Sequence, residues 1–169
     1  MSTDRFTGQS LKLASQALAQ KDPSLWGERA RQTAVERLGW IDLPEKSREL
    51  LPTLDALAAW ARSERQNRFV LSGMGGSSLA PEVISSTLTH SPEEGLVILD
   101  STHPEDVKGI IEVNPEQTLF IISSKSGETI ETLSHLKVIV ERLGQAKLHL
   151  ADHVVVITDP GSPLAKWAA

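Results

Sequence analysis

Residues 73–78 could bind an anion, because a glycine-rich turn is followed there by two hydroxyl side chains, Gly-Met-Gly-Gly-Ser-Ser. Three glycines in four positions remove the Cβ atoms that would keep a ligand away from the backbone. An apolar run precedes the turn and a helical pattern follows it, so the first helical amides lack intrahelical partners and favour a negative charge. The hydroxyls of Ser77 and Ser78 add donors suited to phosphate oxygens. The pattern favours phosphate or nucleotide binding over a tight strand-to-helix turn without a ligand.

Residues 123–132 form a second candidate site, with the sequence Ser-Ser-Lys-Ser-Gly-Glu-Thr-Ile-Glu-Thr. Five hydroxyl residues and one glycine lie between a predicted strand and the most regular helical pattern of the chain. Backbone amides and hydroxyls directed at the same oxygens would form a phosphate cradle. Helix capping is the alternative, and it accounts for one or two of these hydroxyls but not for the whole cluster.

Other signatures of nucleotide or covalent chemistry are incomplete. A P-loop needs a lysine that residues 73–79 lack. A dinucleotide fingerprint needs glycine at position 78, where the chain has serine, although Asp100 after the next predicted strand could bind a ribose. A Rossmann-type nucleotide-binding enzyme therefore stays open as an alternative. The G-x-S-x-G nucleophile elbow is absent from the sequence.

The composition argues against metal binding and thiol chemistry. The chain has no cysteine, which excludes disulfides, thiolate ligands and cysteine nucleophiles. Its five histidines show no metal-ligand spacing, so we expect neither a metal nor a cofactor. His103 follows the second predicted strand and either belongs to the site or caps the next helix. We expect the other four to be surface or boundary residues: His90, His135, His149 and His153.

An alternation of strands and helices after Arg68 positions both candidate loops. Short β-branched apolar runs predict strands near 68–72, 96–100, 118–123 and 153–158, separated by helical patterns at about 78–88, 104–112 and 129–143. Such continuous runs are typical of strands buried on both faces of a parallel sheet. We therefore predict an α/β fold with a doubly wound parallel sheet, whose carboxyl edge carries the ligand loops.

The N-terminal part predicts helices and a connector. Asp22 and Pro23 favour a helix start, since Asp caps helices and Pro suits the first turn. The predicted segments are a helix over 3–21, a helix over about 24–38 ending at Gly39, an extended connector over 40–44, and a helix over about 45–64 interrupted at Pro52. We expect residues 1–66 to be a helical lead-in and residues 67–169 to be the ligand-binding domain.

Charge is distributed unevenly along the chain. The net charge is −5, and residues 69–169 hold 6 Lys or Arg against 13 Asp or Glu, which gives −7 for that part. This balance argues against binding to nucleic acid or to an anionic membrane. A bound phosphate must therefore be held by local amides and hydroxyls. The sequence has neither a run of ~18 apolar residues nor a signal-peptide core, so we expect a cytoplasmic protein.

Both loops resemble motifs of the phosphoglucose isomerases. Residues 73–81 are similar to the glycine-rich motif of that family, and residues 124–132 resemble its phosphate loop, with residues 100–103 at the matching spacing. Residues 38–44 resemble the lead-in of the isomerase half of bacterial bifunctional transaldolase/phosphoglucose isomerases. The resemblance covers nearly the whole chain and implies a three-layer αβα sugar isomerase (SIS) domain.

The resemblance also implies which residues contact a hexose 6-phosphate. Gly76 and Ser77 match positions that contact the sugar. The phosphate-loop positions are matched by Ser124, Lys125 (through its backbone), Ser126 and Thr129. Possible secondary contacts are Gly75, His103 and Glu131. Many isomerases have Thr-Phe-Thr where this chain has residues 126–128, so one hydroxyl is replaced by Glu128, which we expect to point outward because its charge would repel phosphate.

The family's reaction interconverts an aldose and a ketose 6-phosphate through an enediol, and it needs a general base and charge-stabilising groups. In the family these are a Glu, an Arg, a His and a Lys downstream of the region that this chain covers. We therefore expect no catalytic residue before Ala169, and we expect residues 1–169 to be the N-terminal part of a longer, homodimeric isomerase. A stand-alone SIS module that senses sugar phosphates is the other alternative.

Overall fold

The computed structural model of the protein describes residues 8–64, 66–88 and 96–169. The chain divides into two compact units, the first ending at Ala56 and the second comprising Leu57–Ala169. Within the described ranges, every helix is too short or too polar to cross a membrane.

The first unit is a succession of short helices. They are α1 (Gly8–Ala19), η1 (Pro23–Trp26), η2 (Glu28–Ala30), α2 (Arg31–Arg37), η3 (Leu38–Asp42), α3 (Leu43–Lys46), η4 (Ser47–Leu50) and α4 (Leu51–Ser63), where η is a 3₁₀ helix and α4 contains the unit boundary. The predicted helix start at Asp22 is confirmed, because its carboxylate accepts a hydrogen bond from the Ser24 amide at 2.9 Å and Pro23 is the first residue of η1. Residues 3–7 of the first predicted helix lie outside the described residues.

Two predictions for this unit are wrong. The helix predicted over 24–38 is broken into 3₁₀ and α-helical pieces, and the extended connector predicted over 40–44 is helical. Gly39 does not end the helix because it does not adopt the left-handed conformation of a C-terminal glycine. Pro44 lies in the first turn of α3, where a proline is tolerated, and Asp42 pairs with Lys21 and with Lys46 (3.1 Å), which holds the turn together.

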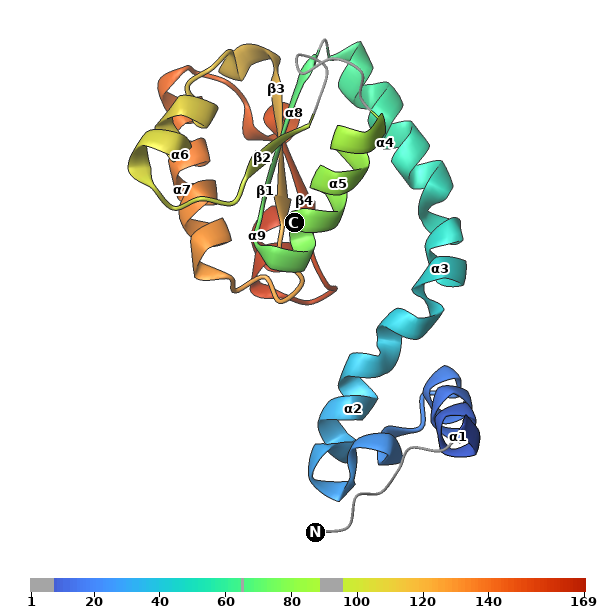
Figure 1. The fold of residues 1–169 in the computed structure, drawn as a ribbon. Helices are drawn as coiled ribbons and strands as arrows, with labels where there is room; N and C mark the ends of the chain where they lie inside the picture. The colour runs from blue at the N-terminus through green and yellow to red at the C-terminus, as the bar shows by residue number, and fades with distance from the viewer. Residues whose placement is uncertain (1–7, 65, 89–95) are drawn as a thin grey trace. The chain divides into compact units, whose positions relative to one another are not determined.

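The second unit contains the predicted parallel sheet. Its strands are β1 (Arg68–Gly73), β2 (Val97–Leu99), β3 (Thr118–Ser123) and β4 (Val154–Ile157), all parallel, in the order β2-β1-β3-β4. The helical elements are η5 (Gly75–Ser77), α5 (Leu79–Leu88), α6 (Pro104–Ile111), η6 (Pro115–Gln117), α7 (Ile130–Gln145), α8 (Leu150–His153) and α9 (Pro163–Ala168). In Figure 1, α6 and α7 lie on one side of the sheet and α5 lies on the other. The predicted α/β fold is confirmed.

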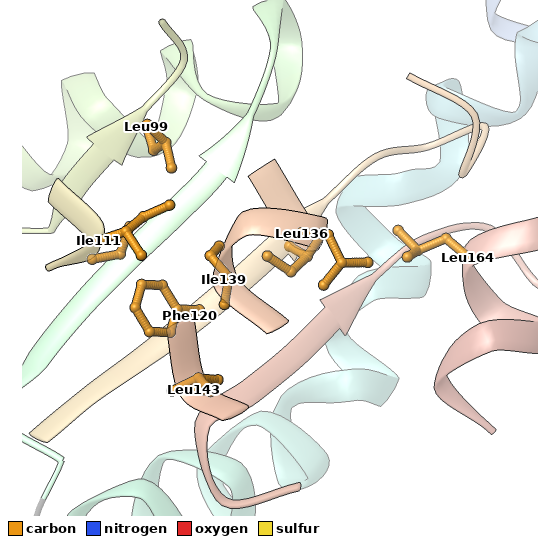
Figure 2. Packing of buried hydrophobic residues seen from close by; sticks show 9 residues of the cluster. Leu99, Ile111, Phe120, Leu136, Ile139, Leu143 and Leu164 are labelled. Atoms are coloured by element: carbon orange, nitrogen blue, oxygen red, sulfur yellow. The ribbon is translucent and has the colours of Figure 1, made fainter. Parts of the chain in front are cut away.

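The core of this unit lies between the sheet and α7. Phe120 of β3 is fully buried, and Figure 2 shows it beside Ile139 and Leu143 of α7. The apolar residues that recur at helical spacing in this segment form one face of α7, and this face packs against alternate residues of the strands. This packing fixes where α7 begins, at the carboxyl edge of the sheet.

Strand register brings the candidate loops together. Ser72 of β1 pairs with Leu99 of β2 on one side and with Ile122 of β3 on the other, and Ser123 pairs with Ile157 of β4. The segments that follow these four strands therefore leave the sheet at one edge, with the glycine-rich turn directly beside the serine-rich loop.

Candidate functional site

The glycine-rich turn packs closely against the neighbouring loop at one point and is open at another. A Cβ at Gly73 would lie 3.1 Å from the Ser123 carbonyl oxygen and 3.0 Å from the Ser77 Cβ, so a side chain at this position would separate the loops. Gly75 has a φ of +54°, which glycine adopts without strain. Gly76 is exposed, and a Cβ there would meet no atom within 4 Å. The open side of the turn at Gly76 is thus accessible to a ligand.

The two serines of this turn differ in their surroundings. Ser77 is half-buried at the end of η5. Ser78 is fully buried, and its hydroxyl donates to the Gly75 carbonyl at 3.2 Å. Ser78 therefore stabilises the turn, and Ser77 is the serine left beside the open side.

The hydroxyls of the serine-rich loop, residues 124–129, shape the loop itself. Ser124 is buried, and its Oγ accepts from the Gly127 amide at 3.1 Å and bonds the Thr129 hydroxyl at 2.9 Å. Ser126 Oγ accepts from the Glu128 amide at 3.2 Å. Thr129 is the N-cap residue of α7, but its side chain bonds no helical amide. Capping of α7 therefore does not account for these hydroxyls.

The backbone amides of this loop are the free donors. Within the described part of the chain, the amides of Lys125, Ser126 and Thr129 have no hydrogen-bond partner. The first amides of α7 also lack intrahelical acceptors, because a helix leaves its initial N–H groups unpaired. An anion placed here would meet several donors and the positive end of the α7 dipole.

The predicted site residues differ in how far they are exposed. Lys125 and Ser126 are exposed, and Thr129 is half-buried. Glu128 is exposed, and Glu131 is half-buried in the first turn of α7. His103 is exposed at the N-cap position of α6 and makes no capping hydrogen bond through its side chain.

A segment between β4 and α9, residues 157–162, braces the serine-rich loop. The Ser124 amide donates to the Ile157 carbonyl at 3.0 Å, and the Asp159 amide donates to the Lys125 carbonyl at 3.1 Å. Buried Ser162 bonds the Thr158 hydroxyl at 2.8 Å and caps α9 by accepting from the Ala165 amide at 3.0 Å. The loop thus has external supports that do not depend on a ligand.

Gly127 is where this brace is tightest. It has a φ of +68°, and a Cβ added there would lie 2.6 Å from Ser162 Oγ and 2.8 Å from Ser162 Cβ. Because only glycine fits both this backbone conformation and this space, the loop conformation depends on residue 127.

The expectation that four histidines are surface or boundary residues is wrong for two of them, which are buried. His135 is 2% exposed, with Nδ1 at 3.0 Å from Ser72 Oγ and Nε2 at 3.0 Å from the Ser101 carbonyl oxygen. His153 is 6% exposed, with Nδ1 at 3.0 Å from the Thr118 carbonyl oxygen. Both are buried because strand ends supply partners for the ring nitrogens. His149 is exposed as expected, and His90 lies outside the described residues.

Burial lowers the pKa of His135 below its usual value of 6.5. The hydrogen bond to the Ser101 carbonyl and the nearby negative charges of Glu131 and Asp100 act in the opposite direction, but burial dominates. His135 is therefore neutral near pH 7.

Two cavities flank α7. One of about 460 Å³ lies between α6 and α7 and is lined by His135, Val107 and Lys108 among others. The other, of about 450 Å³, lies between α7 and α9 and includes Gly127, Ile130 and Trp167. Among the described residues, no group of three His, Asp or Glu side chains is arranged to hold a metal ion.

The second unit is therefore a parallel α/β domain with a loop of unpaired amides at the carboxyl edge of its sheet. Residues 47–163 match the family model described as phosphoglucose isomerase, and the chain belongs to this family.

Curated relatives and solved structures agree with this assignment. The chain is 34% identical over 166 residues to a glucose-6-phosphate isomerase of Thermus thermophilus, covering 90% of this chain and 38% of the relative. It is 38% identical over 100 residues to a glucose-6-phosphate isomerase of a Cyanothece species, covering 57% and 19%. The crystal structure of a glucose-6-phosphate isomerase from Chlamydia trachomatis matches with a TM-score of 0.61 at 25% identity, over 70% of this chain and 23% of that chain. The crystal structure of a hypothetical protein from Thermus thermophilus matches with a TM-score of 0.64 at 30% identity, over 94% and 38%. The chain thus spans well under half the length of these proteins.

Proposed function

We propose that residues 67–169 form a sugar isomerase domain that binds a hexose 6-phosphate as the N-terminal part of a glucose-6-phosphate isomerase. The observation that carries this proposal is the set of unpaired amides in residues 124–129, directed by the fold to the start of α7. Family membership supports a sugar phosphate over a dinucleotide as the ligand.

In this proposal each loop binds a different part of the ligand. The amides of Lys125, Ser126 and Thr129 hold the phosphate oxygens, together with the first amides of α7 and the hydroxyls of Ser126 and Thr129. Ser124, the remaining predicted phosphate-loop residue, is buried and supports this set through its hydrogen bond to the Thr129 hydroxyl at 2.9 Å. Lys125 contributes its amide, which is an unpaired donor, whereas its carbonyl accepts from the Asp159 amide. Gly76 and Ser77 contact the sugar from the adjacent strand end. The secondary contacts are Gly75, His103 and Glu131.

The proposed enzyme interconverts glucose 6-phosphate and fructose 6-phosphate by proton transfer through an enediol. The general base and the groups that stabilise the enediolate come from outside residues 1–169, because no position here matches the family's Glu, Arg, His and Lys. Glu128 and Glu131 belong to the segment that holds the phosphate, several bonds from the reacting C1 and C2 atoms.

Residues 1–169 should therefore bind the substrate without isomerising it. Each missing acid–base group typically contributes ~10²–10⁴-fold, so only a background rate is expected. The measurement is a coupled assay for glucose 6-phosphate formed from fructose 6-phosphate, run beside a full-length isomerase. Activity within about tenfold of the full-length enzyme would show that catalytic groups lie within this sequence.

For the parent enzyme we propose a cytoplasmic homodimer whose isomerase part resembles that of bacterial bifunctional transaldolase/phosphoglucose isomerases, on the likeness of residues 38–44. The parent reading frame on both sides decides whether a transaldolase half precedes it. The same observation tests a stand-alone sensing module, which would not continue into a second α/β domain.

The phosphate site is tested by replacing two of its hydroxyls. We expect the double variant Ser126→Ala/Thr129→Ala to weaken fructose 6-phosphate binding by about 1–3 kcal/mol, because two hydrogen bonds to a charged acceptor are lost. Isothermal calorimetry measures this difference. The matched control is Ser86→Ala/Thr87→Ala, which removes hydroxyls that bond helix carbonyls in α5. Equal affinities of the wild type and the Ser126/Thr129 variant would place the phosphate elsewhere, and preferential binding of NAD would favour a dinucleotide enzyme.

A further inference from the structure

His135 links three segments of the candidate site, although it is not one of the predicted site residues. It lies on α7, and its two ring nitrogens are each 3.0 Å from an oxygen of another segment, Ser72 Oγ near the end of β1 and the carbonyl oxygen of Ser101, two residues after β2. A carbonyl oxygen only accepts, so Nε2 carries the proton and donates to Ser101. Nδ1 is then the acceptor for the Ser72 hydroxyl.

Each partner of this histidine adjoins a different part of the site. Ser72 directly precedes the glycine-rich turn at residues 73–78. Ser101 begins the turn that carries His103, and its own hydroxyl accepts from the His103 amide at 3.1 Å and donates to Asp106 at 2.7 Å. The helix that bears His135 starts at the serine-rich loop. One imidazole therefore connects the ends of β1 and β2 to the helix of the phosphate cradle.

An apolar side chain could not replace these links. Ser72 has no exposed surface, so loss of the imidazole would leave its hydroxyl buried without this partner. The Ser101 carbonyl would also lose its donor, and the turn that presents His103 would lose its attachment to α7. Leaving a buried polar group without a hydrogen-bond partner is unfavourable enough to favour a rearrangement of these turns.

We propose that His135 is a positioning residue that holds the glycine-rich turn, the Ser101–His103 turn and the phosphate-loop helix in one arrangement. The inference rests on the proposed function in so far as these segments bind one hexose 6-phosphate. Its structural part, the coupling of the two turns to α7, is measurable without any ligand.

The test uses variants that keep one link at a time. His135→Phe keeps a flat ring and removes both hydrogen bonds. His135→Asn places an amide near the Nδ1 position and can restore the link to Ser72, whereas His135→Gln reaches the Nε2 position and can restore the link to Ser101. The control is His149→Phe, because His149 is an exposed histidine on the same unit.

We expect His135→Phe to shift the amide NMR signals of both turns and to weaken fructose 6-phosphate binding by about tenfold. His135→Gln should restore the signals of residues 101–103, and His135→Asn those of residues 73–78, each with partial recovery of affinity. His149→Phe should change neither readout.

The outcomes separate this inference from the proposed function. Unchanged amide signals in both turns and unchanged affinity in His135→Phe would overturn the role of His135. If the wild type binds no sugar phosphate, the proposed function fails, while the amide signals still decide whether His135 couples the turns. If His135→Phe does not fold, Ser72→Ala takes its place: a shift at residues 73–78 and at the start of α7 supports the coupling, and its absence contradicts it.

Discussion

The two loops of the candidate site are neighbours at the carboxyl edge of the sheet, yet the structure supports them differently. The serine-rich loop, residues 124–129, is buried in part and braced from outside by residues 157–162. The glycine-rich turn, residues 73–78, is held mainly by its own backbone and Ser78, and its side at Gly76 is open. The proposed phosphate cradle is thus supported by contacts within the protein, whereas the proposed sugar side leaves space for a ligand. Preorganised donors bind an anion without the cost of ordering the loop.

Gly127→Ala should have the largest effect, because it acts on the braced loop. The new Cβ would overlap Ser162 Oγ at 2.6 Å in a left-handed backbone conformation. We expect a loss of about 1–3 kcal/mol in the free energy of unfolding, as for other overpacking substitutions, and a loss of phosphate binding. Chemical denaturation and calorimetry measure the two effects.

The matched control for this variant is Gly161→Ala. Gly161 also has a positive φ of +77°, but a Cβ there meets no atom within 4 Å. A stability loss in Gly127→Ala no larger than in the control would mean that backbone strain alone explains it. If the contact is responsible, Gly127→Ala/Ser162→Gly should recover part of the loss.

The parallel sheet was predictable because continuous apolar runs between turn residues leave few alternatives. The loop positions followed from it, since parallel strands deliver their ends to one edge. His135 and His153 were placed wrongly because their partners are oxygens at strand ends distant in sequence, which local patterns do not reveal. The brace at Gly127 was missed for the same reason, since Ser162 is a contact of tertiary structure. The helical residues 40–44 were missed because ion pairs to Asp42 and a proline in a first turn override an apolar, extended-looking segment.

Acidification should lower the stability of the folded protein through protonation of His135. The folded protein holds the pKa of His135 below 6.5 through burial, whereas the unfolded chain protonates it near that value. The unfolded state therefore binds more protons once the pH falls below about 6.5, and stability decreases from there down to the folded pKa. The midpoint temperature of thermal unfolding should fall between roughly pH 7.5 and pH 5.5 in the wild type, and it should fall less in His135→Gln. Parallel curves would show that His135 does not contribute to the acid response.

Gly76→Ala should have the smallest effect on folding. Its φ is not positive and its surroundings are open, so the free energy of unfolding should change by no more than about 0.5 kcal/mol. The methyl group would occupy space on the sugar side, so fructose 6-phosphate affinity should fall roughly tenfold, or about 1.4 kcal/mol. Stability and affinity measured on one preparation separate the two effects, and unchanged affinity would contradict a ligand at this side of the turn.

The most direct measurement is an amide NMR titration of residues 1–169 with fructose 6-phosphate, with inorganic phosphate in a parallel sample. The structure predicts that both ligands shift the amides of Lys125, Ser126 and Thr129 and of the first turn of α7. The sugar phosphate should in addition shift Gly76 and Ser77, which inorganic phosphate should leave unchanged. Saturable shifts confined to another part of the chain, or none for either ligand at millimolar concentration, would contradict the assignment of the phosphate cradle to residues 124–129.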